Sequence, residues 1–291
     1  MVIVITGPTA TGKSELGIYL AKKLNGEIIN ADSTQIYKDM EICTNKIKDT
    51  EGIVHYLFDE KELTEDYTVC DFQKDSRLLI DDILKRGKIP ILVGGTGLYI
   101  KACLYDYKFE DKLDEEYEDI SDDELYEMLL EVDPNTDIHK KNRKRVVSAI
   151  NYYKVNNKPY SEKKKTDKLL YDTIFIGLTA SRDVLYDRIN KRVDKMIDEG
   201  LIDEAYNLYK SNIRSKAVMT PIGPKELFDF FDGKVSLDET IENIKSKSRR
   251  YAKRQYTWFN NQMNLKWFKV NYDNFKKTEE EIYNYIKLKL D

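Results

Sequence analysis

Short runs of apolar, mostly β-branched residues alternate with longer segments of helical period along this chain. Runs long enough for buried strands, and too short for helices, lie at residues 2–5, 27–32, 89–93, 172–179 and 265–268. Helical spacing predicts helices at residues 15–24, 72–85, 181–192, 202–209, 237–261 and 278–290. Loops are expected at residues 39–66, with 54–58 packed on the core, and again up to residue 226. The alternation predicts an α/β fold with a parallel sheet.

The segment between the first strand and the first helix has the spacing of a phosphate-binding loop, or P-loop. Its glycines allow backbone N–H groups to turn inward around an anion, and the helix N-terminus adds its dipole. Lys13 adds a full charge, and the Ser14 hydroxyl is placed to hold Mg²⁺. A glycine-rich turn without a ligand is the alternative, which the strand–loop–helix context disfavours. The predicted phosphate or diphosphate site consists of Gly7, Pro8, Thr9, Ala10, Thr11, Gly12, Lys13 and Ser14.

Two other strand ends bear on the chemistry. Asp32 ends the second strand, and in a doubly wound sheet it would lie near the mouth of the P-loop. A carboxylate there can accept a proton or hold metal-bound water, although it could also only cap a helix. The strand at residues 89–93 ends in Gly94, Gly95 and Thr96, where P-loop ATPases and GTPases commonly place an acid for Mg²⁺. This favours a small-molecule kinase or another diphosphate user over a motor or switch NTPase.

Charge is distributed unevenly, although the net charge of −4 over 291 residues is small. An acidic block at residues 110–133 is followed by a basic cluster at residues 140–145 and a helix. A solvated surface is the usual meaning of a single charged run. The change of composition nevertheless predicts a helical insertion domain at residues 111–168, within a core formed by residues 1–110 and 169–291.

The helix predicted at residues 237–261 carries a second group of basic residues. Lys245, Arg249 and Lys253 recur at intervals of four, and Arg250 and Arg254 lie beside them. Flanking aromatic residues make this contiguous basic face suitable for RNA backbone and bases, with a plain solvated helix as the alternative. The helix at residues 181–192 also clusters arginines near its start, as mononucleotide kinases do at phosphate sites; they are Arg182, Arg188 and Arg192.

The cysteine content and the absence of long apolar runs indicate the cellular compartment in which the protein works. The chain has three cysteines, far apart and without a Cys-x-x-Cys pair, so zinc and a disulfide framework are not expected. There is no signal peptide and no long apolar run. We therefore expect a cytoplasmic protein with no membrane association.

Four segments together resemble the bacterial tRNA dimethylallyltransferase family, in order and spacing over nearly the whole chain. They are residues 7–14, 31–37, 94–99 and 252–259. The resemblance implies a P-loop NTPase-like core that transfers a dimethylallyl group from dimethylallyl diphosphate to the exocyclic amine of an adenine. That adenine lies on the 3′ side of the anticodon in tRNAs that read codons starting with U, and diphosphate is released.

The resemblance also implies roles for residues. Asp32 is the general base, Thr9 and Lys13 are catalytic, and residues 9–14 hold the donor's diphosphate with Mg²⁺, to which Ser14 is a ligand. The anticodon stem–loop of tRNA is the partner, and we expect the chain to act as a monomer. The tRNA contacts implied are Asp32, Ser33, Thr34, Gln35, Thr96, Lys144, Arg145, Arg249, Lys253 and Arg254.

The chain departs from the family pattern at four positions that concern tRNA rather than the donor loop, namely Glu118, Ser148, Thr220 and Pro224. Other functions remain open on the sequence. An enzyme that prenylates free adenine nucleotides would have a similar core and less use for the basic segments. A small-molecule or nucleoside kinase uses the same loop, and a nucleotide- or RNA-binding protein without chemistry is the third alternative.

Overall fold

The computed structural model describes residues 1–109, 113, 115, 117–162 and 168–290, and the chain divides into two compact units. The larger unit, Met1–Tyr105 with Leu169–Asp291, holds the sheet, and the smaller unit is Asp106–Lys168. The α/β fold class expected from the alternation of strands and helices is confirmed. The insertion predicted at residues 111–168 falls within the smaller unit, which begins at Asp106.

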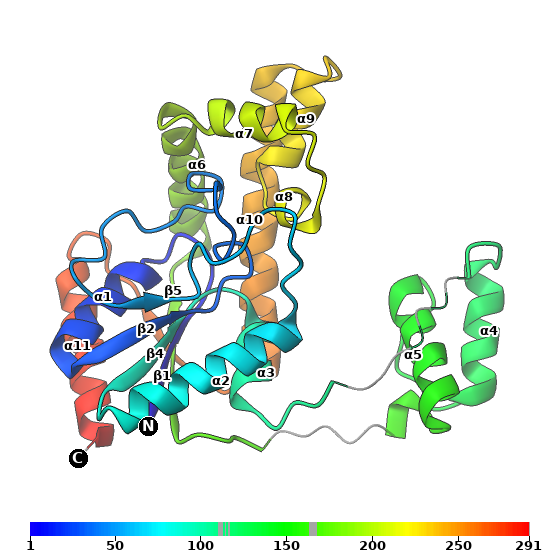
Figure 1. Cartoon of the computed structure of the whole chain (residues 1–291), viewed down its shortest axis with the longest axis horizontal. Coiled ribbons are helices and arrows are strands. Elements are labelled where there is room, and N and C mark those ends of the chain that lie inside the picture. The colour runs from blue at the N-terminus through cyan, green and yellow to red at the C-terminus, as the bar shows by residue number, and fades with distance from the viewer. Residues whose placement is uncertain (110–112, 114, 116, 163–167, 291) are drawn as a thin grey trace. The chain divides into compact units, whose positions relative to one another are not determined.

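A six-stranded parallel sheet forms the centre of the larger unit (Figure 1). Its strands lie in the order β3-β2-β4-β1-β5-β6. The strand β1 is therefore central, and the P-loop that follows it lies at the middle of the edge formed by the carboxyl ends of the strands. The edge strand β3 lies in a segment predicted as a loop packed on the core, and its two residues are too few to give a period. The strands are β1 Val2–Thr6, β2 Gly26–Asn30, β3 His55–Tyr56, β4 Ile89–Val93, β5 Thr173–Thr179 and β6 Lys266–Lys269.

Helices cover both faces of this sheet, as its two-sided burial requires. Within β1, Ile3 and Ile5 belong to one core and Val2 and Val4 to the other, because alternate side chains point to opposite faces. Helices α1 Lys13–Leu24 and α11 Phe275–Leu290 cover the first face. The second face is covered by α2 Val69–Lys85, α3 Gly97–Leu104 and α10 Leu237–Gln262.

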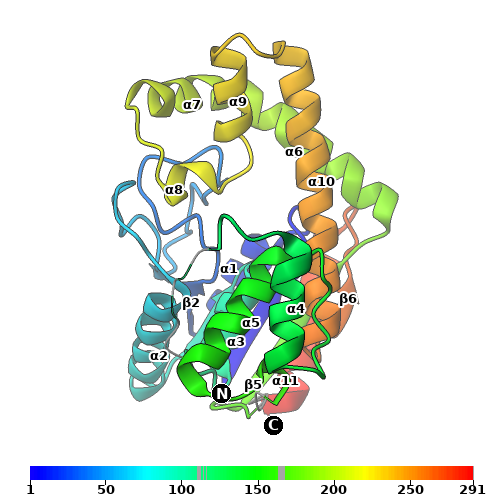
Figure 2. The same cartoon turned by 90° about the vertical axis from the view of Figure 1, so that its right-hand side faces the viewer.

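Four shorter or surface helices gather with the first half of α10 beyond one end of the sheet (Figures 1 and 2). They are α6 Arg182–Asp198, α7 Leu201–Lys210, α8 Lys216–Met219 and α9 Pro224–Phe231. The loop predicted up to residue 226 was wrong, since α8 and α9 form there. Pro224 takes the first helical position, where its missing N–H costs nothing, and the Gly223 N–H donates to Glu226 Oε2 at 2.8 Å.

The smaller unit is a helical hairpin with its own core. It consists of α4 Asp122–Val132, α5 Arg143–Asn156 and the short 3₁₀ helix Tyr160–Glu162. Leu125, Leu129, Val146 and Ile150 are buried between α4 and α5. Arg143 pairs with Asp122 at 2.6 Å, so the acidic block and the basic cluster partly neutralise each other. Residues 110–112, 114 and 116 of the predicted acidic block lie outside the described residues.

Among the helices of the described residues, none is long and apolar enough to cross a membrane.

Candidate active site

The loop between β1 and α1 is built as an anion cradle. Gly7 and Gly12 have φ values of 134° and 88°, in the left-handed region that favours glycine. The Thr11 hydroxyl donates to the Pro8 carbonyl oxygen at 2.8 Å, and Lys13 Nζ donates to the same oxygen at 2.7 Å. The Lys13 ammonium is thereby drawn over the loop, beside the N-terminus of α1, where an anion is favoured.

Two residues from distant helices hold Thr9 in this loop. The Thr9 N–H donates to Gln255 Oε1 at 2.9 Å, and Arg192 Nη1 donates to Thr9 Oγ1 at 2.6 Å. Because Oγ1 accepts from Arg192, the Thr9 hydroxyl proton is free to be donated to a ligand. Neither Gln255 nor Arg192 was among the predicted site residues. The predicted cluster of arginines on α6 was the signal for Arg192, whereas the signal for Gln255 was its place in the segment 252–259, one of the four that carry the family resemblance.

The electrostatic environment of Lys13 is that of a site prepared for an anion. Its pKa is lowered from 10.5 to about 7, chiefly by burial and also by the nearby charge of Arg192, while Asp32 partly opposes both. An anion that binds beside Lys13 stabilises the charged form of the lysine and raises its pKa again. The free protein therefore holds a mixture of neutral and charged Lys13 near neutral pH.

This shift predicts proton uptake when an anion binds. At pH 8, above the Lys13 pKa, most free protein has a neutral lysine, and bound pyrophosphate restores the ammonium with uptake of about one proton. At pH 6 the lysine is already charged, so its contribution vanishes. Calorimetry in buffers of different ionisation enthalpy measures the uptake. In Lys13→Arg the guanidinium stays charged throughout, so this uptake should be lost, and equal uptake by both proteins would contradict the assignment.

Asp32 lies just beyond β2, which ends at Asn30 rather than at the acid itself. The Asp32 N–H donates to Asn30 Oδ1 at 3.1 Å. Asp32 Oδ1 accepts from the Thr34 N–H at 3.1 Å and from the Thr34 hydroxyl at 2.8 Å. This is a turn and not a helix cap, since no helix of the described chain begins there. No hydrogen bond to Oδ2 is found within the described residues, so one oxygen is fixed and the other is available.

The glycines that replace the acid at the end of β4 serve close packing. A Cβ at Gly94 would lie 2.2 Å from the Ala31 carbonyl oxygen, and one at Gly95 would lie 2.2 Å from Gln255 Nε2. Gln255 Nε2 instead donates to the Gly95 carbonyl oxygen at 3.1 Å. Next to them, Thr96 Oγ1 accepts from the Ser33 N–H at 3.1 Å. The Gln255 amide therefore joins the P-loop to the end of β4, and the Thr96 hydroxyl joins the end of β4 to the segment after β2.

Two cavities meet at the P-loop. The smaller one is mainly polar, and its walls include Ser14, Asn30, Gln35, Asn45 and His55. The larger one has a volume of about 440 Å³ and combines a polar end with an apolar wall. That wall includes Ile189, Val193, Met196, Ile222 and Ile244. Both cavities are lined by Thr9, Lys13, Asp32, Thr44, Gly95 and Arg192.

The structure brings several of the predicted tRNA-binding residues to these cavities. Ser33, Thr34, Thr96 and Arg254 line the larger cavity, and Gln35 lines the smaller one. Arg254 also borders a groove along α10, together with Arg250, Lys253, Thr257, Trp258, Asn261 and Gln262. Thr220, one of the positions that depart from the family pattern, lies in the wall of the larger cavity.

The prediction of a contiguous basic face on α10 was wrong at Lys245 and Arg249. Lys245 is 15 % exposed and pairs with Asp194 of α6 at 2.7 Å. Arg249 is half-buried and donates to Asn190 Oδ1 at 2.6 Å. The period of α10 could not reveal this, because α6 packs on that side. A tRNA role for Arg249 stays a prediction, and the exposed basic residues of the predicted face are Arg250, Lys253 and Arg254.

Lys144 and Arg145 are exposed on α5 of the smaller unit, and their tRNA role stays a prediction. Of the remaining departures from the family pattern, Ser148 is half-buried on α5 and Glu118 is exposed.

The residues at the loop fit a Mg²⁺ ion that arrives with a diphosphate. Mg²⁺ in such sites takes one or two carboxylate or hydroxyl oxygens, phosphate oxygens and water, not a dedicated cage. Ser14 and Asp32 both line the smaller cavity and offer oxygens of this kind. No cluster of three acidic, histidine or cysteine side chains suited to a metal is found in the described part of the chain. The bound diphosphate and water would supply the remaining oxygens.

Comparison with known proteins gives one consistent family. The family model of IPP transferases matches residues 35–262. The tRNA dimethylallyltransferases of Geobacillus thermodenitrificans and Bacillus anthracis are 50 % and 45 % identical to this chain. The alignments cover 99 % of the chain in both cases, and 97 % and 96 % of the relatives.

Solved structures give the same result. A tRNA isopentenylpyrophosphate transferase from Staphylococcus epidermidis has a TM-score of 0.76 at 42 % identity, with 99 % of each chain covered. A eukaryotic dimethylallyltransferase acting on tRNA has a TM-score of 0.79 at 33 % identity, with 92 % of this chain and 73 % of that one covered.

Proposed function

We propose a reaction on the premise that this chain belongs to the tRNA dimethylallyltransferase family, the IPP transferases. The chain is a prenyltransferase that moves a dimethylallyl group to tRNA. The donor is dimethylallyl diphosphate, and the acceptor is the exocyclic amine of the adenine on the 3′ side of the anticodon in tRNAs that read codons starting with U. The observation that carries this is the larger cavity, whose polar end at Lys13 and Arg192 continues into an apolar wall.

The shape of that cavity matches the donor's two chemical halves. Dimethylallyl diphosphate has a small branched hydrocarbon on a multiply charged diphosphate head. Lys13, Arg192 and the Thr9 hydroxyl serve the head, while Ile189, Val193 and Met196 shield the five-carbon group from water. A nucleoside triphosphate would place a polar ribose against this apolar wall, which costs the hydrogen bonds of its hydroxyls. The wall thus favours a prenyl donor over ATP.

The residues at the polar end divide the chemistry between them. In the transfer, the bond between the allylic carbon and the diphosphate oxygen breaks, and the bond from the adenine nitrogen to that carbon forms. The electron pair of the broken bond leaves with diphosphate, where Lys13 and Arg192 stabilise the developing charge and Thr9 donates its hydroxyl proton as a hydrogen bond. The open oxygen of Asp32 accepts the proton that the amine loses. Mg²⁺ held through Ser14 would further offset charge on the leaving diphosphate.

The acceptor must leave the anticodon stack to reach Asp32. An adenine inside a stacked loop cannot enter a cavity, so it has to be turned out of the stack. Ser33, Thr34, Gln35 and Thr96 surround the approach to Asp32 and offer polar contacts to the base. Lys253 and Arg254 on α10, with Lys144 and Arg145 on α5, are the proposed contacts to the RNA backbone. One chain supplies both cavities, so we propose that it acts as a monomer.

A direct test uses purified protein, dimethylallyl diphosphate, Mg²⁺ and an anticodon stem–loop RNA with adenine at the target position. Mass spectrometry should find one added C₅H₈ unit on that RNA and none on a matched RNA with inosine there, which lacks the amine. Transfer to AMP but not to RNA would identify a free-nucleotide prenyltransferase, and phosphorylation of a small acceptor by ATP would identify a kinase. Light scattering of the active protein tests the monomer.

A further inference from the structure

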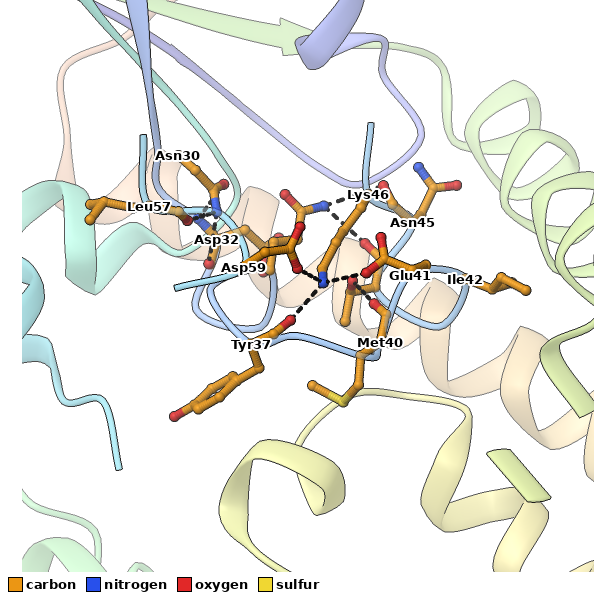
Figure 3. Close-up of polar contacts among 12 residues, drawn as sticks. Asn30, Asp32, Tyr37, Met40, Glu41, Ile42, Asn45, Lys46, Leu57 and Asp59 are labelled. Atoms are coloured by element: carbon orange, nitrogen blue, oxygen red, sulfur yellow. Dashed lines mark hydrogen bonds and ion pairs between the residues drawn. The ribbon is translucent and has the colours of Figure 1, made fainter. Parts of the chain in front are cut away.

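Lys46 is a buried cation beside the site, and the proposed reaction gives it no role. Its side chain is 3 % exposed, whereas lysine is almost never fully buried unless paired. Its ammonium donates to the Tyr37 carbonyl oxygen at 2.6 Å, and it pairs with Glu41 at 3.0 Å and with Asp59. Figure 3 shows Lys46 among these three acceptors. An ammonium has three protons, and the three acceptors satisfy all of them.

The contacts of Lys46 hold a loop that lines both cavities. Residues 33–46 contain turns but no helix or strand of their own apart from a single bridge at Tyr37, so side chains must fix their path. Gln35 Nε2 donates to the carbonyl oxygens of Thr44 at 2.9 Å and Asn45 at 3.3 Å, which ties the start of the loop to its end. Thr44 lines both cavities, and Gln35 lines the smaller one.

The same network continues from Lys46 to Asp32. The Asp59 N–H donates to the Gln35 carbonyl oxygen at 3.3 Å, so the partner of Lys46 also holds Gln35. Two residues earlier, the Leu57 carbonyl oxygen accepts from Asn30 Nδ2 at 2.9 Å, and Asn30 in turn accepts from the Asp32 N–H (Figure 3). Lys46 and Asp32 are therefore connected through the backbone of residues 57–59 and the hydrogen bonds on either side of it.

Loss of the Lys46 ammonium would remove the contacts that fix the path of the loop of residues 33–46. Without Lys46 the half-exposed carboxylates of Glu41 and Asp59 would lose the cation that lies between them, and the Tyr37 carbonyl oxygen would lose its charged partner. A buried polar group left without a partner, and like charges brought together, both disfavour the existing loop path. The loop would then sample other positions while the P-loop, which Lys46 does not touch, keeps its structure.

We propose that Lys46 is a positioning residue for the transfer reaction. It fixes the loop of residues 33–46 through Tyr37, Glu41 and Asp59, so that Asp32 and Gln35 meet the flipped adenine in a single geometry. It touches neither donor nor acceptor. The inference rests on the proposed function for its kinetic consequence, whereas its structural consequence is independent of any activity.

The test compares Lys46→Met with Lys48→Met. Lys48 is 71 % exposed and pairs only at the surface, with Glu199 at 3.2 Å, so it is a matched control two positions along. Lys46→Met should lower kcat at saturating substrates by about 10- to 100-fold, because small displacements of catalytic groups have effects of that size. Pyrophosphate affinity should stay at the wild-type value, and Lys48→Met should keep both. A merely structural role would lower Tm and leave kcat per folded molecule intact.

Hydrogen–deuterium exchange separates this inference from the proposed function. Residues 33–46 should exchange faster in Lys46→Met and residues 7–14 should not, whether or not the wild type transfers a prenyl group. Wild-type kcat and wild-type exchange in that variant would overturn the proposal.

Should Lys46→Met fail to fold, Asp59→Asn removes one carboxylate and keeps the lysine. It should show the same pattern to a smaller extent, and unchanged kcat and exchange would overturn the proposal equally. A wild type without transfer would count against the proposed function instead, and exchange would still decide the positioning.

Discussion

Replacing Asp32 with asparagine is expected to lower kcat for prenyl transfer by about 10²- to 10⁴-fold, the usual contribution of a general base. An amide cannot accept the proton that the adenine amine loses. Its oxygen can still accept from the Thr34 N–H and hydroxyl, as Asp32 Oδ1 does at 3.1 Å and 2.8 Å. The turn that presents the side chain should therefore survive, and binding of RNA and pyrophosphate should change little.

Single-turnover kinetics on the anticodon stem–loop would measure this loss, with RNA affinity measured separately by filter binding. Asp39→Asn is the control, since Asp39 is an exposed acid in the same loop and lines neither cavity. A rate for Asp32→Asn close to that of Asp39→Asn would show that proton transfer at this carboxylate does not limit the reaction. A variant that lost RNA binding as well would show that Asp32 holds the acceptor rather than activating it.

The parts of the site that sequence could predict are those encoded locally. The P-loop is a contiguous segment between a strand and a helix, and the spacing of Gly7, Gly12 and Lys13 carries its geometry. Asp32 could be placed because parallel strands end at one edge of a sheet. Thr96 and Ser33 follow strands in the same way, and they do meet through a hydrogen bond of 3.1 Å. In each case one strand end was enough to place the residue.

The residues that sequence could not assign are fixed by tertiary contacts that no local pattern records. Gln255 reaches Thr9 across a sequence separation of 246 residues, and nothing in the period of α10 distinguishes a polar core residue from a polar ligand. Lys46 sits in a stretch without helix or strand, where a lysine is ordinarily expected at the surface. The basic face of α10 failed for a related reason, because only packing against α6 decides which of its bases meet solvent.

Arg192→Met is the second change with a large expected effect, a loss of about 10²- to 10³-fold in kcat, as found when one donor to a developing negative charge is removed. Arg192 Nη1 donates to Thr9 Oγ1 at 2.6 Å, so the substitution removes both a charge and the bond that orients the Thr9 hydroxyl. Pyrophosphate affinity should fall by about 10- to 100-fold, the range for hydrogen bonds to charged groups.

The control for that change is Arg182→Met at the exposed first residue of the same helix, which lines neither cavity. Arg192 also lowers the pKa of Lys13, so its removal should raise that pKa from about 7 toward the ordinary value. Proton uptake on pyrophosphate binding at pH 8 should then shrink in Arg192→Met and persist in Arg182→Met. A large fall in kcat with unchanged proton uptake would place Arg192 away from Lys13 in the working enzyme, and its effect would then act through Thr9 alone.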